Sequence, residues 1–509
     1  MSRRNTRTRL LCTVLALLIL LPLASCGSGG EESVKDTSDG GSAPGNTLSS
    51  ETEGAESTDT DAETEDPRPA PECAEESFGG AEYRVLYRYG AVAYNCSDIV
   101  AEGINGEPIN DAVYNRNLSL EDTLGVKLCA IANSSPAMFV QRDIRSGGRE
   151  FDTVAESMNQ LYPLALSGCL LDWRTLPYFD VSAPWWDENS ASEMSLGGRI
   201  FMMTGDITMK TSGCVRFLNF NKDIWDRYPL PDPYSLVREN TWTIDRFGSI
   251  ISTVSEDLDG NGTLDGHDLW GLLADPPEFM LAGCGVLYTS KDENDLPYID
   301  CINEHTVTAL EKLKAVLSDE NHVTDYAKFA KGMNTSSYPH IFDYARARFA
   351  AGQIMVIGNC ADDIRLQIAG MEDRYGILPT PKLDENQAEY YHLIDANAPM
   401  WGFSSNQTDV KLASAATEVW AYLSGDLVDA FYEVTMKKKR ADMPEDAEML
   451  DLVRSSVRYE ITYVVDVGIS GVITKAYESG NLMSTYQKQQ KLISKKLGSL
   501  EKKLGALEE

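Results

Sequence analysis

The sequence lacks the motifs on which most enzyme classes depend. Its five histidines are isolated from one another, no H-E-x-x-H occurs, and the ten cysteines form no C-x-x-C pair, so neither a zinc hydrolase site nor a structural zinc site is supported. No G-x-S-x-G, phosphate loop or dinucleotide fingerprint is present either. Because Asp and Glu number 78, the paired carboxylates of a glycosidase stay open.

Positive charge is also scarce. Lys and Arg number 45, which leaves a formal net charge of -33. So acidic a chain repels nucleic acid and anionic lipid, and we see no broad basic face that would compensate. We therefore expect no nucleic-acid partner, and a charge that serves solubility.

The first 26 residues predict the compartment. Four arginines lie within the first nine residues, and the apolar run Leu10–Leu23 is too short for a comfortable membrane span. The run ends at Leu23-Ala24-Ser25-Cys26, which resembles the bacterial lipobox. That resemblance implies a signal peptide over 1–26, a lipid on Cys26, and a place on the extracellular face of the membrane. A signal peptide with an incidental cysteine is the alternative.

The segment 27–77 is expected to be a disordered acidic linker. It has no aromatic residue and carries 15 acidic residues against Lys35 and Arg68. Such a composition cannot bury enough apolar surface to offset its ordering entropy.

Eight cysteines remain after Cys12 and Cys26. An oxidising exterior permits disulfides, but the sequence does not choose a pairing. Cys169 and Cys214 lie in apolar runs, and we expect both to be buried free thiols.

From Phe78 onward, expected strands alternate with expected helices. The strands are 83–87, 126–131 and 151–155, and the helices between and after them are 109–124, ended by Gly125, and 158–166. This alternation predicts an α/β fold with parallel sheets flanked by helices.

The stretch Gly197–Phe247 carries the clearest family signal. It contains two expected strands, 199–203 and 214–220, separated by Thr204-Gly205-Asp206, and then "FNKDIWD", "DPY" and "TWTIDRF" in that order. This order resembles the bacterial extracellular solute-binding proteins of ABC importers, in the sugar-binding family that includes maltose-binding protein. The resemblance extends from about Phe78 to Glu460 through "FDTV", "SGCLLDW" and the segment Tyr375–Lys382.

The resemblance implies a two-lobed, periplasmic-binding-protein-like fold of type II with a hinge. The first lobe would be 78–205 plus 393–440, and the second 206–392 plus 441–509. It also implies capture of a carbohydrate between the lobes and delivery to an ABC permease, without catalysis. A surface enzyme acting on polysaccharide and a non-transport sugar-sensing lipoprotein are the alternatives, and the identity of the sugar stays open.

The expected ligand site draws on loop tips and crossings, because open α/β sheets bind ligands beyond the carboxyl ends of their strands. Aromatic rings suit the C–H faces of sugars, and carboxylates and amides suit their hydroxyls. For each aromatic candidate, core packing is the alternative. The candidates are Tyr89, Ser157, Asn159, Trp186, Asp206, Asn359 and Trp401.

The loop Asp257–Asp268 matches an EF-hand calcium loop through its sixth position. Gly262 takes the sharp turn, and Asp268 stands at position 12 where a bidentate Glu is usual. We expect a structural Ca²⁺ site, and an acidic turn that binds nothing is the alternative. The expected ligands are Asp257, Asp259, Asn261, Thr263, Asp265 and Asp268.

The last expected helix, 492–507, has leucines and Ile493 at alternating spacings of four and three. Because this seam is little more than two heptads long, we expect it to pack onto its own chain rather than onto a coiled-coil partner.

Overall fold

The computed structural model describes residues 68–90 and 95–507, which belong to one compact unit, Pro67–Glu509. The expected signal peptide, Cys26 and the linker up to residue 67 lie outside the described residues. Within the described ranges, no helix is long and apolar enough to span a bilayer.

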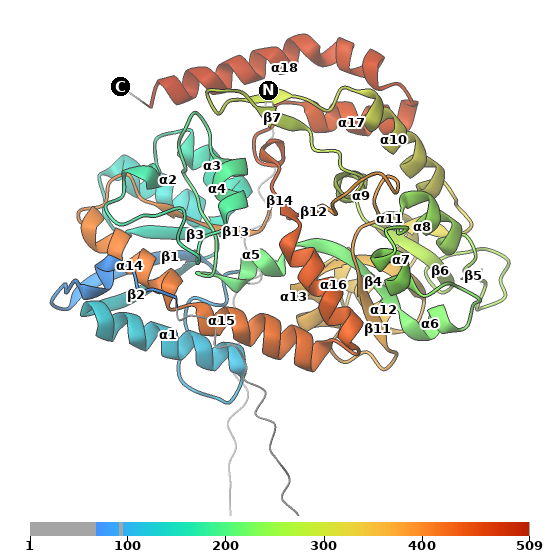
Figure 1. Cartoon of the computed structure of the whole chain (residues 1–509), viewed down its shortest axis with the longest axis horizontal. Helices are drawn as coiled ribbons and strands as arrows, with labels where there is room; N and C mark the ends of the chain where they lie inside the picture. The colour runs from blue at the N-terminus through green and yellow to red at the C-terminus, as the bar shows by residue number, and fades with distance from the viewer. Residues whose placement is uncertain (1–67, 91–94, 508–509) are drawn as a thin grey trace, which may run out of the picture. The chain divides into compact units, whose positions relative to one another are not determined.

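Fourteen strands are described, and Figure 1 labels most of them. They are β1 (Ala81–Arg88), β2 (Val126–Asn133), β3 (Thr153–Ser157), β4 (Arg216–Asn221), β5 (Ser255–Glu256), β6 (Leu269–Ala274), β7 (Thr289–Lys291), β8 (Pro297–Ile299), β9 (Val323–Asp325), β10 (Ile354–Cys360), β11 (Tyr375–Leu378), β12 (His392–Leu393), β13 (Pro399–Phe403) and β14 (Val457–Arg458).

Helices separate most of these strands. The α-helices are α1 (Pro108–Leu124), α2 (Pro136–Ser146), α3 (Met158–Ala165), α4 (Glu188–Met194), α5 (Met209–Gly213), α6 (Lys222–Asp226), α7 (Pro233–Arg238), α8 (Ile244–Ile251), α9 (Pro277–Gly283), α10 (Glu304–Leu317), α11 (Tyr326–Phe329), α12 (Ile341–Ala350), α13 (Ala361–Asp363), α14 (Val410–Tyr422), α15 (Gly425–Asp429), α16 (Pro444–Ser455), α17 (Ile469–Ser479) and α18 (Leu482–Gly505). The 3₁₀-helices are η1 (Glu72–Glu75), η2 (Trp173–Thr175) and η5 (Ile461–Tyr463), and the π-helices are η3 (Ile364–Ile368) and η4 (Ala430–Arg440).

Two sheets organise the chain (Figure 1). The first has the order β13-β3-β1-β2, with β1 parallel to both β2 and β3, and β13 antiparallel to β3. The second has the order β11-β4-β10-β6-β5, and β9 adds to β6. Strand β13 lies more than 240 residues after β3 in the sequence, so the chain leaves the first sheet, builds the second, and returns.

Local signals explain most element ends. Gly125 follows α1 with a φ of 58°, a left-handed conformation that glycine adopts without a Cβ penalty. The Thr243 side chain accepts a hydrogen bond from the backbone N–H of Arg246 and caps α8. The end at Gly125 was predicted from the sequence. Every residue of β3, β4, β6, β10 and β13 is buried, as expected of strands covered on both faces.

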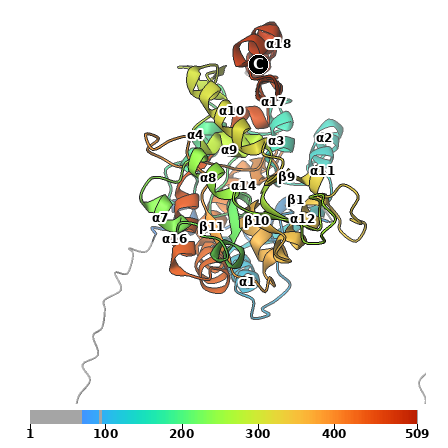
Figure 2. The same ribbon diagram turned by 90° about the vertical axis from the view of Figure 1, so that its right-hand side faces the viewer.

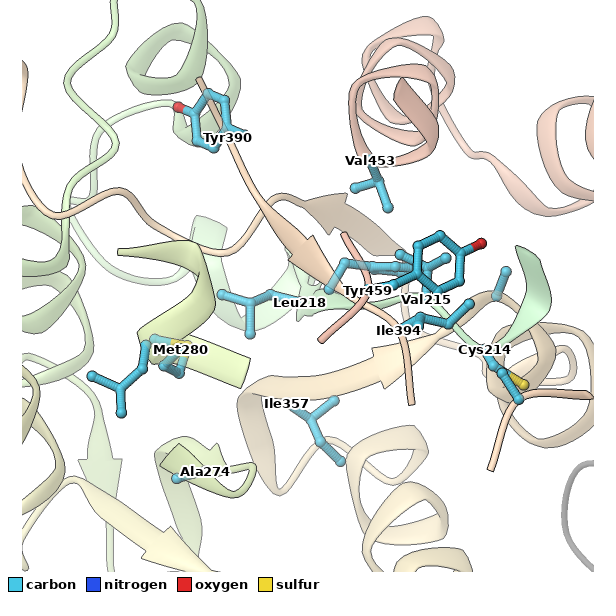
Figure 3. Close-up of a cluster of buried hydrophobic side chains, with 14 of the residues drawn as sticks. Cys214, Val215, Leu218, Ala274, Met280, Ile357, Tyr390, Ile394, Val453 and Tyr459 are labelled. Atoms are coloured by element: carbon cyan, nitrogen blue, oxygen red, sulfur yellow. The ribbon is translucent and has the colours of Figure 1, made fainter. Parts of the chain in front are cut away.

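The apolar core has two clusters. One surrounds β1 and α14 and contains Trp173, Trp401 and Trp420. The other runs through the second sheet and continues to the segments that link the sheets. Figure 3 shows part of this second cluster, where Leu218 of β4, Ile357 of β10 and Ile394 come together from distant parts of the chain.

Several expected boundaries were wrong. Residues 199–203 form isolated bridges rather than a strand. The last helix begins ten residues before its expected start, at Leu482, where Asn481 caps it. It packs against α17 of its own chain, as expected. Ordered structure also reaches back past Phe78, because η1 buries Cys73, whose thiol lies 3.9 Å from the Ala415 carbonyl of α14.

The eight described cysteines are all free thiols. Cys169 and Cys214 are buried, which confirms the prediction made for them.

Candidate ligand-binding site

The first segment that passes between the two sheets, from Met203 to Val215, brings two sequence motifs together. Trp186 forms an antiparallel bridge with Gly205, and the Asp206 backbone N–H donates to the Trp185 carbonyl at 2.8 Å. A Cβ on Gly205 would lie 2.1 Å from that carbonyl oxygen. The close approach therefore requires glycine, and it places Trp-Trp-Asp beside Thr-Gly-Asp.

A cavity of about 210 Å³ opens against this bridge. We call it the crossing cavity, because its walls come from both passages between the sheets and from the helical segments η4 and α16. The side chains that matter for ligand chemistry are Trp186, Asp187, Asp206, Tyr432, Arg454 and Tyr459.

The crossing cavity mixes acidic, basic and aromatic groups. Burial raises the pKa of Asp206, and an ion pair with the Arg68 guanidinium opposes this shift. The Tyr459 hydroxyl donates to Asp187 Oδ2 at 2.6 Å. The Arg454 guanidinium lies 4.3 Å from the centroid of the Tyr432 ring, and within the described ranges it has no carboxylate in ion-pair contact. The cavity can therefore offer a ligand hydrogen-bond acceptors, a guanidinium without a carboxylate partner among the described residues, and small exposed parts of the Trp186 and Tyr432 rings, which are 5% and 4% exposed.

A buried carboxylate holds the two tryptophans. The Trp185 indole N–H donates to Glu418 Oε1 at 2.8 Å, and the Trp186 indole N–H lies 3.2 Å from each carboxylate oxygen. Glu418 lies on α14 and is 3% exposed. Burial raises its pKa to about 8, although both indoles oppose the shift. We did not select Glu418 from the sequence, although it is the one acidic residue of the largely apolar helix α14.

The structure does not gather the seven expected ligand residues into one site. Only Trp186 and Asp206 share the crossing cavity. Tyr89 is 52% exposed beyond β1. At the end of β3, the Ser157 hydroxyl donates to Asn159 Oδ1 at 2.9 Å, and Asn159 in turn donates to Asn397.

The other two candidates are inside the fold. Asn359 is fully buried in β10, where its Oδ1 accepts from Arg346 Nε at 3.0 Å. Trp401 is 1% exposed and packs edge-on against Trp420 with ring centroids 5.1 Å apart. Because β13 is covered on both faces, Trp401 has no open ring face, so the core-packing alternative applies to it and the stacking role does not.

A buried ionic network at the carboxyl edge of the second sheet was also missed. Arg216 pairs with Asp275 at 2.6 Å, and Arg346 pairs with Asp363 at 2.8 Å. Lys210 of α5 pairs with Asp362 of α13 and so connects the passage between the sheets to the second sheet. Removal of one partner from such a buried ion pair lowers the stability of the fold strongly, because the other charge stays buried without a partner.

A second cavity of about 420 Å³ lies next to the first, and Tyr459 lines both. Most of its charged side chains are engaged with each other or with the backbone, and Asp300 accepts a hydrogen bond from the Ser290 hydroxyl. Arg458 pairs with Glu193, and Lys291 Nζ donates to the carbonyls of Ser192 and Ser195. This cavity therefore offers polar walls with few unpaired charges.

The acidic loop after α8 gathers three of its expected metal ligands. Carboxylate oxygens of Asp257, Asp259 and Asp268 lie within 4.8 Å of one another. The Gly262 N–H donates to Asp257 Oδ2 at 2.7 Å, and this bond helps to lower the pKa of that carboxyl. Asp265 Oδ1 instead accepts from the backbone N–H of His267. The three gathered oxygens suit a hard cation such as Ca²⁺, which stays a prediction.

Comparison with known proteins gives a result for structure and none for sequence. No family model and no curated protein matches the sequence. Among solved structures, M. tuberculosis UspC aligns with a TM-score of 0.50 at 12% identity, over 82% of this chain and all of that one. An ABC substrate-binding protein of Listeria monocytogenes in complex with cycloalternan gives 0.49 at 13% identity, over 84% of this chain and 99% of that one. The maltose/maltodextrin-binding domain of Bdellovibrio bacteriovorus bound to maltotriose gives 0.48 at 11% identity, over 83% and 100%.

These likenesses concern the fold. With two principal sheets, helices on their faces and a chain that returns to the first sheet, the α/β, two-lobed, periplasmic-binding-protein-like prediction is confirmed.

Proposed function

We propose that this chain is an extracellular solute-binding protein that captures a carbohydrate and delivers it to an ABC permease, held at the membrane by a lipid on Cys26. The observation that carries the ligand assignment is the crossing cavity, which combines Trp186 and Tyr432 with Asp206 and Arg454 between the two sheets of a solute-binding fold.

Sugar chemistry matches this set of groups. A pyranose offers flat C–H faces and a rim of hydroxyls, so it needs ring faces and paired donors and acceptors. The Trp186 and Tyr432 rings border the cavity and supply the apolar part of this contact. Asp187 and Asp206 accept hydrogen bonds, and Arg454 donates them in a planar fork. A volume of about 210 Å³ equals roughly seven water volumes, which is the scale of one small ring.

The position of the site also suits capture and release. The crossing cavity is lined by both segments that pass between the sheets, at Gly205 and Ile394, so a change in the angle between the sheets would alter its walls. A ligand that bridges Trp186 to Arg454 would favour one such angle. Solute-binding proteins need this coupling, because the permease must distinguish loaded from empty protein.

Calorimetric titration against a panel of mono- and oligosaccharides tests the proposal. Asp206→Asn and Arg454→Gln should each weaken binding by roughly 10- to 100-fold, as loss of one charge-assisted hydrogen bond does. Asp122→Asn and Arg145→Gln alter exposed residues on the first-sheet side and serve as matched controls. Full-strength binding in both site variants would refute the crossing cavity as the site.

The enzyme alternative has one observation in its favour, since Asp187 and Asp206 bring two carboxylates to one cavity. Asp187 is engaged by Tyr459 and Asp206 by Arg68, which suits binding better than proton transfer. Incubation with oligosaccharides and analysis of the products decides between the two. Hydrolysis by the wild type that is absent in Asp206→Asn would favour the enzyme alternative over the transport proposal.

A further inference from the structure

The last helix, α18, has a charge unlike that of the rest of the chain. Its 24 residues contain six lysines and one acidic residue, Glu501, so its formal charge is +5, while the whole chain carries -33. The helix lies beside α17 at the edge of the described unit in both views (Figures 1 and 2). Its buried side chains are Leu482, Ile493, Leu500 and Leu504.

Four of the lysines form one row on the opposite face. Lys488, Lys491, Lys495 and Lys502 follow each other at spacings of three, four and seven, which places them on one side of an α-helix. We call this row the lysine stripe. At 1.5 Å per residue it is about 21 Å long. All four side chains are exposed, and none of them pairs with a carboxylate of the described residues.

The surroundings of the lysine stripe leave its charge uncompensated. Lys496, which lies off the stripe, pairs with Asp466 at 2.6 Å. Leu492, one turn after Lys488, is 47% exposed on the same side of the helix. Because the apolar face of α18 packs on its own chain, the lysines and the exposed Leu492 form the face of the helix that is left for a partner.

We propose that the lysine stripe docks this protein on an anionic phospholipid surface. The stripe is straight and lies along the edge of the unit, so it fits a plane and does not enclose a small ligand. Lysines of this kind bind anionic headgroups, and the attraction falls off within a Debye length. The acidic remainder of the chain is repelled by the same surface, and so the contact also orients the molecule.

The lipid surface explains this feature better than a soluble polyanion does. A flexible polymer needs no straight row, and it gains nothing from an exposed leucine. The inference does not depend on the sugar site or on lipidation of Cys26, because the stripe and the crossing cavity share no residue.

Vesicle co-sedimentation tests the inference on the chain from Gly27 onward, which retains the whole compact unit and lacks the apolar leader. We expect binding at low salt to vesicles rich in phosphatidylglycerol, weak binding to phosphatidylcholine, and release at high salt. Each lysine removed should lower the partition coefficient about fivefold. The triple variant Lys488→Gln, Lys491→Gln, Lys495→Gln should therefore bind roughly 100-fold more weakly.

The matched control is Lys331→Gln, Lys438→Gln, Lys439→Gln, which removes the same charge from exposed sites away from α18. It should bind vesicles nearly as the parent does. An equal loss in both triple variants, or no binding to anionic vesicles at low salt, would overturn the inference. Binding of soluble polyphosphate without binding of vesicles would overturn it as well. Sugar titration of the same variants keeps this outcome separate from that of the proposed function.

Discussion

Replacement of Glu418 by glutamine should remove a loss of stability that the wild type undergoes as the pH rises. The carboxyl is 3% exposed and accepts hydrogen bonds from Trp185 and Trp186. Glutamine keeps its shape and removes the ionisation. Its amide group presents one N–H₂ donor to an indole N–H, so the variant loses part of one hydrogen bond at every pH.

The magnitude follows from the pKa. Burial raises the pKa of Glu418 to about 8 from 4.5, so the folded protein holds this proton over a range in which the unfolded chain has lost it. Each pH unit in that range costs about 1.4 kcal/mol of stability. The wild type should therefore lose about 3 kcal/mol between pH 4.5 and 7, and about 4 kcal/mol by pH 9, through this group alone. Glu418→Gln lacks this loss and pays roughly 1–3 kcal/mol for the mismatched amide at all pH values.

Urea unfolding followed by circular dichroism at pH 5, 7 and 9 measures the difference. We expect the variant to be less stable than wild type at pH 5 and more stable at pH 9. Glu385→Gln, at an exposed position, controls for loss of a carboxylate as such. Parallel profiles for wild type and Glu418→Gln would refute the argument, because they would mean that Glu418 ionises as in water.

Three further outcomes are expected. Gly205→Ala should lower the melting temperature by the equivalent of at least 1–3 kcal/mol and disturb the crossing cavity, since its Cβ would meet the Trp185 carbonyl. The control is Gly471→Ala in α17, which should be neutral or stabilising because a Cβ there has nothing within 4 Å. Equal effects of the two substitutions would contradict the geometry at Gly205. Calcium should raise the melting temperature by mass action, with a dissociation constant of roughly 10⁻⁴–10⁻³ M, and Asp257→Ala with Asp259→Ala should abolish the rise while sugar binding persists; a wild type indifferent to both millimolar calcium and EDTA has no such site. Cys26→Ala should release the protein from the membrane or leave an uncut signal, and a processed, membrane-bound variant in a fatty-acid labelling assay would exclude Cys26 as the anchor.

Local signals made much of the fold predictable. The glycine after Leu124 and the threonine before Ile244 mark helix ends because each satisfies or frees backbone groups within one turn. The alternation of strands and helices is also a local pattern along the chain, and it predicted the α/β fold. Residues 199–203 show the limit, since an apolar run alone does not supply a partner strand.

The candidate site depended on contacts that sequence spacing does not encode. Trp186 and Asp206 could be chosen from their motifs, but Tyr432, Arg454 and Tyr459 reach the same cavity from more than 200 residues away. Trp401 looked equally suited to stacking or packing, and the outcome was set by Trp420 on a separate helix. We saw no basic face in the sequence, because the last helix was expected only from Leu492, which left Lys488 and Lys491 outside it.

The reactivity of the eight free thiols can report local unfolding of the chain. Cys129 on β2 is half-buried, and the other seven described cysteines are buried. In a chain that starts at Gly27, a thiol-reactive dye should therefore modify Cys129 first, slowly at neutral pH because burial raises the pKa of that thiol. Modification of any other described cysteine then requires local unfolding of the packed region around it. Mass spectrometry of the modified peptides would show which regions open and in what order.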